Sequence, residues 1–335
     1  MKNIAKYTVI SIFILMLCTA CPYNKGAYPD ITSGSQGSVL SAPYVEDGIS
    51  LVVSQDKKTI NIKVTSSDGT AIKLEGCTDS SIQHNTYQNV TAKNRIIILK
   101  PQTGADIIEL TCINQDVLKI NAEGYEKLQT LTCNANKLIS LTFNINSVLK
   151  DLNCAQNQLT KLNVHPCRQL ETLKCGNNKL TSLDLSGLNK LTKAECWQNN
   201  LTELKLTGCT ALTKLDCENN NLSALNLSNL TALTEVNCKS NKLTELTVTG
   251  CTALKQIECY NNNLKENAFT TLLNALPDKT SLSPDFGKAV LYKEGETGNV
   301  TVFTTPEALT NAVTAATNNN WKLYKKTGTD TDQEI

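Results

Sequence analysis

The sequence predicts a repeat solenoid, a fold in which short β-strands from successive repeats stack into one parallel sheet. Leucine or isoleucine opens each repeat at a constant interval of 21 residues, from Ile107 to Leu254, with no insertion. Eight of the 14 cysteines keep the same interval: Cys112, Cys133, Cys154, Cys175, Cys196, Cys217, Cys238 and Cys259. A period of roughly 20 to 29 residues is typical of leucine-rich repeats. Such folds usually offer an extended binding surface rather than a reaction vessel.

Each repeat follows the pattern L-x-x-L-x-C-x-x-N-x-L-x-x-L-x-L, which is clearest over residues 212–232. The apolar residues at positions four and six alternate with polar ones, as in a half-buried strand. The apolar residues at positions eleven, fourteen and sixteen point inward from the opposite wall. Because a 21-residue turn is near the short limit, we expect this convex wall to be extended rather than helical. Residues 107–264 are therefore predicted to form eight leucine-rich repeats.

An asparagine recurs at position nine of every repeat except the first, which has Gln115. The chain must turn sharply where it leaves each strand, and the turn leaves backbone groups unpaired unless a short amide satisfies them. We predict that this ladder is structural. Its members are Asn136, Asn157, Asn178, Asn199, Asn220, Asn241 and Asn262.

The cysteines allow three interpretations: metal ligands, disulfides or small buried apolar residues. None has the CxxC-like spacing of metal sites, and His84 and His165 lack metal partners nearby in sequence. Stacked parallel strands aim their Cβ vectors alongside each other, which is poor disulfide geometry. We therefore predict a ladder of buried thiols that replace leucine. The same interpretation extends to position nineteen, with Cys167, Cys209 and Cys251; Cys77 lies outside the array and is unassigned.

These units resemble the 21-residue cysteine-ladder repeats of internalin-like bacterial surface proteins. They are also similar to the leucine-rich-repeat lipoproteins of Gram-negative gut anaerobes. The resemblance covers residues 107–264 and implies ligand binding on the concave sheet, in adhesion or host interaction. This chain departs from the wall-anchored members because it ends in TGTDTDQEI, without a sorting motif or hydrophobic tail. The expected attachment therefore moves to the other end.

Residues 1–21 have the form of a lipoprotein signal peptide. Lys2 and Lys6 precede an apolar stretch over residues 7–17, which is too short for a spanning helix. The following LCTAC resembles a lipobox with Cys21 as the acylated residue, and ordinary secretion is the alternative. Residues 22–47, rich in Gly, Ser and Pro, are predicted to be a flexible tether. We expect an exported lipoprotein at the outer membrane or cell surface of a Gram-negative bacterium, touching the membrane only through its lipid.

Two caps are predicted to cover the apolar core and strand edges that an open solenoid would expose. Residues 48–106 hold short alternating runs typical of strands and form a β-rich N-terminal cap. An independent carbohydrate-binding domain is the alternative for this module. Residues 265–326 are predicted to form a mixed α/β C-terminal cap with Trp321 in its core, and 327–335 a disordered tail. Within this cap we expect helices over 266–276 and 306–318 and strands over 289–294 and 299–305.

The candidate binding site lies on the concave face, which positions three, five and seven of each strand form. Charge is concentrated in repeats four to eight, and position seven carries two aromatic residues, Trp197 and Tyr260. Aromatic side chains in solvent are favoured as binding anchors. We therefore predict a protein or glycan site on repeats five to eight. It comprises Trp197, Tyr260, Glu195, Asp216, Glu218, Lys214, Lys239 and Glu258.

Composition and motifs disfavour other functions. Positions three, five and seven of the repeats carry seven acidic and four basic residues, a mixed face that disfavours nucleic acid, and the 32 basic and 31 acidic residues of the whole chain agree. The sequence has no GxSxG elbow, phosphate-binding glycine loop or HExxH motif, so we expect no catalytic residues, metal or cofactor. Paired carboxylates drive glycoside hydrolysis, but only in a desolvated pocket that a shallow sheet lacks. The chain is predicted to be a monomeric, non-enzymatic binding protein. A structural envelope lipoprotein without a specific ligand is the alternative.

Overall fold

The computed structural model describes residues 40–102, 104–280 and 286–335. The predicted signal peptide, Cys21 and residues 22–39 of the predicted tether lie outside the described residues. Residues 41–335 form one compact unit. No helix in the described ranges has the length and apolar character needed to cross a lipid bilayer.

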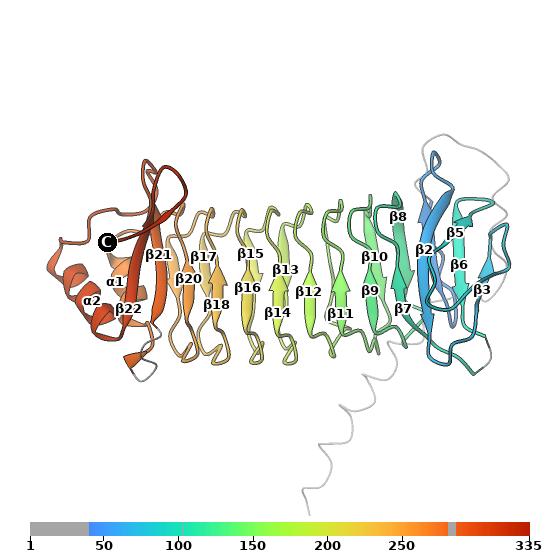
Figure 1. Ribbon diagram of the computed structural model, residues 1–335, viewed down its shortest axis with the longest axis horizontal. Helices are drawn as coiled ribbons and strands as arrows, with labels where there is room; N and C mark the ends of the chain where they lie inside the picture. Colours follow the sequence, from blue (N-terminus) through green and yellow to red (C-terminus); the bar gives the residue numbers. More distant parts are fainter. Residues whose placement is uncertain (1–39, 103, 281–285) are drawn as a thin grey trace, which may run out of the picture. The chain divides into compact units, whose positions relative to one another are not determined.

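A 13-stranded sheet contains one strand from each predicted repeat (Figure 1). Neighbouring strands pair in parallel, shifted by one repeat, so that Leu152 lies beside Leu173. This confirms the predicted solenoid and its parallel sheet. The eight strands are β7 (Ile107–Thr111), β9 (Thr130–Thr132), β11 (Asp151–Asn153), β12 (Thr172–Lys174), β14 (Lys193–Glu195), β16 (Lys214–Asp216), β18 (Glu235–Asn237) and β20 (Gln256–Glu258).

The opposite wall is extended, as predicted, because a short repeat leaves too few residues for a helix. Its strands form parallel pairs, β8 with β10, β13 with β15 and β17 with β19. The strand pairing of this wall is interrupted at residues 161–164, which form no strand. The bounds are β8 (Val117–Ala122), β10 (Ser140–Phe143), β13 (Ser182–Asp184), β15 (Glu203–Lys205), β17 (Ala224–Asn226) and β19 (Glu245–Thr247).

The core between the two walls consists of leucines and thiols. In the fourth repeat, Leu173, Cys175 and Leu180 are all 0% exposed. All twelve cysteines among the described residues are free and buried, so the ladder is part of the core, as predicted. Burial disfavours the thiolate and raises the pKa of Cys112 to about 12. Such thiols stay protonated and chemically inert.

The asparagine ladder joins consecutive repeats. The side-chain amide of Asn199 donates to the main-chain oxygens of Cys175 and Cys196, both at 3.1 Å. Its Oδ1 accepts the backbone N–H of Leu180 at 3.0 Å. The turn is tight, because position eight of every repeat has a positive φ, between 49° at Gln198 and 57° at Asn261. These contacts confirm the structural interpretation of the ladder.

The N-terminal module continues both walls of the solenoid (Figure 1). β2 (Thr59–Ser66) pairs antiparallel with β7 and with β5 (Gln88–Thr91), at the end of the concave sheet. On the convex side a six-stranded sheet has the order β10-β8-β1-β6-β3-β4. One hydrophobic cluster includes residues of both the module and the repeats, so the module is a cap and not an independent domain. The added convex strands are β1 (Ile49–Val53), β3 (Ile72–Glu75), β4 (Ser81–Ile82) and β6 (Ile96–Lys100).

The last residues of the predicted tether belong to this cap. Val45 is 5% exposed, and the hydroxyl of Ser50 donates to the carbonyl of Pro43 at 2.6 Å. The backbone N–H of Asp47 donates to the carbonyl of Gly124 at 3.0 Å. The boundary predicted at residue 47 therefore moves to about residue 41.

The C-terminal cap extends the concave sheet by three strands. β21 (Gly287–Lys293) pairs in parallel with β20, and β22 (Trp321–Lys326) pairs in parallel with β21. Helices α1 (Glu266–Asn274) and α2 (Glu307–Asn318) lie where the sequence predicts them. Trp321 is 1% exposed, as expected for a core residue.

Two expectations for the C-terminal region are wrong. Residues 327–335 are not a disordered tail, because β23 (Asp332–Glu334) pairs antiparallel with β22. Residues 299–305 form no strand. Instead Asn299 adds a further rung to the asparagine ladder: its Oδ1 accepts the backbone N–H of Leu264 at 2.9 Å, and its amide donates to the carbonyl of Cys259 at 2.9 Å.

Candidate functional site

The concave face is hollowed over repeats five to eight, where the sequence places the candidate site. The cavity has a volume of about 390 Å³ and is lined by residues of β14, β16, β18 and β20 together with Lys239. We refer to it as the concave hollow. Five predicted site residues line it, and Trp197, Glu218 and Tyr260 do not. The five are Glu195, Lys214, Asp216, Lys239 and Glu258.

Trp197 is half-buried and rests against the neighbouring repeat. A Cβ atom added at Gly176 would lie 2.4 Å from the indole Cε2 atom. The ring therefore occupies the space that a side chain at position seven of the fourth repeat would fill. Much of its contact area is committed to internal packing.

Tyr260 does not stand in solvent, and that expectation is wrong. The residue is 8% exposed, and Lys239 Nζ lies 5.7 Å from its ring centroid. Burial is the main cause that raises the pKa of Tyr260, while Lys239 and Lys326 of β22 act in the opposite direction. The repeat pattern does not predict this burial, because the burial depends on the C-terminal cap adjoining the last repeat.

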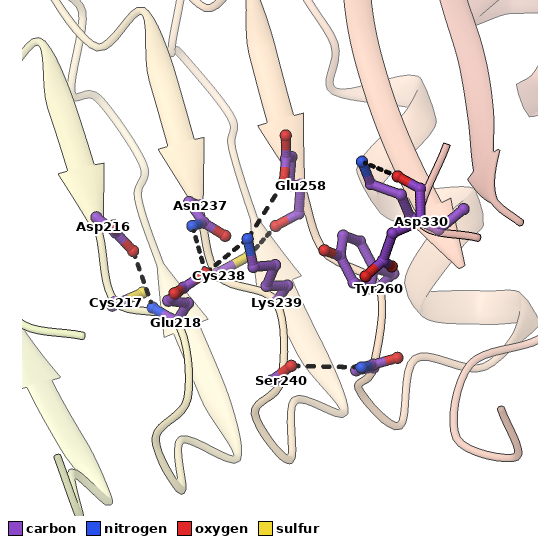
Figure 2. A network of polar contacts seen from close by, with 12 residues as sticks. Asp216, Cys217, Glu218, Asn237, Cys238, Lys239, Ser240, Glu258, Tyr260 and Asp330 are labelled. Atoms are coloured by element: carbon purple, nitrogen blue, oxygen red, sulfur yellow. Dashed lines mark hydrogen bonds and ion pairs between the residues drawn. The ribbon is translucent and has the colours of Figure 1, made fainter. Parts of the chain in front are cut away.

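Each lysine of the concave hollow is paired with a carboxylate of the same chain. Exposed pairs of this kind contribute little to stability, but they neutralise most of the charge on the face. Figure 2 shows Lys239 between Glu218 and Glu258. The pairs are Lys193–Glu195 at 2.5 Å, Lys214–Glu235 at 2.9 Å, Lys239–Glu218 at 2.6 Å and Lys239–Glu258 at 3.7 Å.

Asp216 makes no ion pair within the described ranges. Its Oδ1 accepts the backbone N–H of Glu218 at 3.2 Å (Figure 2). Burial raises the pKa of Asp216 to about 6, and repulsion from Glu218 and Glu195 adds to the effect, which the Glu218 hydrogen bond and Lys239 oppose. The protonation of this carboxyl therefore changes in the weakly acidic range.

Asn237 lies beside Asp216 on the next strand. Its side-chain amide donates to Glu218 Oε2 at 2.8 Å. Its Oδ1 is buried and accepts no hydrogen bond from the described part of the chain. The hollow thus places a carboxylate that has no ion pair, Asp216, beside a buried amide oxygen that has no donor among the described residues, Asn237 Oδ1. This feature depends on side-chain conformation, and the sequence did not reveal it.

A second hollow of about 410 Å³ lies nearer the N-terminal cap and was not predicted. It is lined mainly by neutral residues such as Thr132 and Asn153, together with Lys174, which forms no ion pair among the described residues. The repeat pattern does not reveal it, because its lining mixes Asp151 and Lys174 with neutral side chains and contains no aromatic residue. Across the described ranges no three His, Cys, Asp or Glu side chains are grouped to hold a metal. The chemistry that both hollows present is hydrogen bonding and charge.

Comparison with known proteins finds likeness in structure only. No protein-family model and no curated protein matches the chain. Among solved structures, the functional domain of InlJ from Listeria monocytogenes, which includes a cysteine ladder, is 26% identical over 56% of this chain and 49% of that domain, with a TM-score of 0.37. YopM from Yersinia enterocolitica is 24% identical over 42% of this chain and 30% of that one, with a TM-score of 0.37.

The leucine-rich-repeat protein LIC12759 from Leptospira interrogans is 18% identical, over 58% of this chain and 66% of that protein, with a TM-score of 0.31. The chain thus spans about half of the InlJ domain and less than a third of YopM. The repeats of the structure itself decide the class. Their 21-residue period, asparagine ladder and column of buried thiols make this chain a cysteine-ladder leucine-rich-repeat solenoid.

Proposed function

We propose that this chain is a non-enzymatic, monomeric binding protein of the cell envelope. It recognises a protein or glycan through the concave hollow of repeats five to eight. One observation carries the proposal: the hollow combines about 390 Å³ of space with Asp216, a carboxylate without an ion-pair partner among the described residues, beside Asn237 Oδ1, which accepts no hydrogen bond from them. Buried polar groups normally have hydrogen-bond partners, so a ligand that supplies donors is favoured there.

The scaffold suits recognition because the site residues stand on short strands fixed by a continuous core. Leu215 and Val236, which lie between the site residues on β16 and β18, are each 2% exposed. A site held on rigid elements loses little conformational freedom when a ligand binds. The shallow, polar shape of the hollow fits binding rather than catalysis.

The binding proposal is tested by a ligand screen followed by site-directed charge reversal. Immobilised full chain is screened against a displayed random-peptide library and a glycan array. Lys214→Glu, within the hollow, is expected to change the affinity of captured ligands about tenfold or more, because it reverses a charge of the lining and breaks the pair with Glu235: acidic ligands should weaken and basic ligands should strengthen. Lys179→Glu, an exposed lysine outside the hollow, is the matched control. Equal effects of the two variants on ligand affinity would show that the hollow is not the binding site.

The envelope location is a separate part of the proposal and rests on the sequence of residues 1–21. If Cys21 is the acylated residue, metabolic labelling with palmitate marks the wild-type chain and not Cys21→Ser. Protease treatment of intact cells then tells whether the repeats face the outside. Palmitate incorporation that persists in Cys21→Ser would contradict the assignment.

A second candidate function, glycan binding at the N-terminal cap, is favoured by one exposed aromatic residue. Tyr87 is 53% exposed, and Lys63 Nζ lies 5.9 Å from its ring centroid. Polar side chains stand nearby on β2 and β5, where the amide of Asn61 donates to Asn89 Oδ1 at 2.9 Å. A glycan captured on the array that still binds Tyr87→Ala would exclude this site.

A further inference from the structure

We propose that the partner is a protein that inserts an arginine side chain into the concave hollow, where the guanidinium binds Asp216 and Asn237. This inference rests on the proposed binding function of the hollow and names the chemistry of its ligand.

The positive and negative charges that line the hollow do not balance. Its lining contains three lysines, and each is paired with a glutamate of the chain. Lys239 is shared between Glu218 and Glu258, so one cation serves two carboxylates there. Asp216 has no cation within ion-pair distance in the described ranges. The hollow therefore has surplus negative charge, which a basic group complements.

The positions of Asp216 and Asn237 favour a ligand with several donors in one plane. Asp216 and Asn237 are paired residues on adjacent strands, about 5 Å apart in the direction of the inter-strand hydrogen bonds. Asn237 Oδ1 is buried without a donor. A guanidinium carries five N–H groups in a rigid fork, whereas an ammonium group is a compact point charge. The fork is the protein side chain best suited to donate to both acceptors at once.

Charged groups face Asp216 from every neighbouring strand. The basic ones are each bound to a glutamate, and Asp216 itself is protonated over part of the weakly acidic range. A bound cation stabilises its ionised form, so binding below about pH 6 releases a proton and weakens as the pH falls. The facing groups are Lys193 and Glu195 on β14, Lys214 on β16, Glu218 after it, Glu235 and Asn237 on β18, Lys239 after it, and Glu258 on β20.

The experiment pans a random-peptide display library on the full wild-type chain and, in parallel, on Asp216→Asn. The variant keeps the shape and the hydrogen-bond acceptor for the Glu218 N–H but removes the charge. Peptides from the wild-type selection are then synthesised with arginine, lysine or citrulline at the enriched position. Their affinities are measured for wild type, Asp216→Asn and the control Asp151→Asn, which replaces an aspartate on the second hollow.

Enrichment of arginine on wild type but not on Asp216→Asn is the expected result. The arginine peptide should bind about 10- to 100-fold more tightly than its citrulline counterpart, and Asp216→Asn should cancel that difference while Asp151→Asn preserves it. The arginine peptide should also weaken between pH 7 and pH 5.

Other outcomes separate this inference from the proposed function. If the affinity of enriched peptides changes on Lys214→Glu yet they show no preference for arginine, the hollow binds proteins but the arginine assignment is wrong. If only glycans bind at the hollow, the partner class is wrong and the binding function stands. If no ligand responds to any substitution in the hollow, both proposals fail.

Discussion

At the residue scale, one asparagine per repeat carries the connection between turns. Replacing Asn199 by alanine leaves the backbone N–H of Leu180 and the carbonyls of Cys175 and Cys196 without their side-chain partner. Buried groups left unpaired cost free energy, so Asn199→Ala should lower the free energy of unfolding by about 2 to 4 kcal/mol. Denaturant titration measures the loss. The exposed neighbour Asn200→Ala is the control and should change stability by less than about 0.5 kcal/mol.

The contact between Trp197 and Gly176 predicts a coupled pair of substitutions. Gly176→Ala places a methyl group where the indole lies and should destabilise the protein by about 1 to 3 kcal/mol. In a Trp197→Ala background the same change should be nearly neutral, because the space is then empty. A double-mutant cycle from thermal unfolding gives the coupling energy. Additive effects would show that the ring does not rest on Gly176.

The raised pKa of Asp216 predicts a pH-dependent gain from Asp216→Asn. The folded state binds a proton near pH 6, whereas the unfolded state does so near the usual value of 3.8. Wild-type stability from this group is therefore highest below pH 3.8 and falls as the pH rises to about 6. Asp216→Asn should be more stable than wild type at pH 7.5, by about 1 kcal/mol after solvent screening, and equal to it at pH 3.5. A gain that is independent of pH would contradict this assignment.

The sequence is most informative at this scale where a residue recurs. The thiols and asparagines repeat every 21 residues, so the same role must fit the same position in every repeat, which makes that role predictable. The exposure predicted for Tyr260 is wrong, and the role of Asn237 was not predicted. In both cases the environment of the side chain depends on neighbouring residues that do not recur with the repeat. The burial of Tyr260 depends on the cap that follows the last repeat. The free acceptor of Asn237 depends on which way its amide points.

At the element scale, the C-terminal hairpin of β22 and β23 is held by side-chain charge as well as by backbone pairing. Asp332 is bound by Lys288 and by Lys326, the latter at 2.7 Å. The polar segment DQE has no alternation that predicts a strand, which explains why the sequence suggested disorder. Helices α1 and α2 were predicted because their apolar spacing is local.

Removal of residues 327–335 should expose Tyr260. Without the hairpin, Lys326 loses Asp332 and the end of the concave sheet opens. Nitration by tetranitromethane, mapped by mass spectrometry, should rise at Tyr260 toward the level of Tyr87, which is 53% exposed and serves as the internal reference. Thr329→Ala, an exposed substitution in the turn, should leave Tyr260 protected. Unchanged protection after truncation would show that other residues cover the ring.

At the scale of the whole molecule, one hydrophobic core runs through both caps and all repeats. The N-terminal cap was predicted because an open solenoid end exposes apolar side chains. Its pairing could not be predicted, because β1 joins β6 and β8 across long stretches of sequence. Stability in such a fold is shared between each repeat and its neighbours.

Deletion of residues 41–106 should therefore disrupt more than the cap. It leaves β7 without β2 and β8 without β1, and it uncovers Leu110 and Ile120, which are 0% and 1% exposed in the intact chain. We expect the truncated chain to aggregate and its melting temperature to fall by more than about 10 °C, since several kcal/mol of packing is lost. Size-exclusion chromatography and circular dichroism give the two measurements. A monomeric truncation with the original melting temperature would mean that the module folds separately.

The junctions between repeats have a genetic consequence. Each repeat contacts the one before it through the same asparagine hydrogen bonds and the same leucine and cysteine positions. Unequal crossing-over between equivalent codons therefore deletes or duplicates a whole repeat and leaves an interface of the same kind between the repeats that remain. The number of repeats, and with it the length of the solenoid, can thus change under selection while the two caps stay the same. Populations of the producing organism should carry alleles that differ by multiples of 63 nucleotides, three per residue of the 21-residue unit.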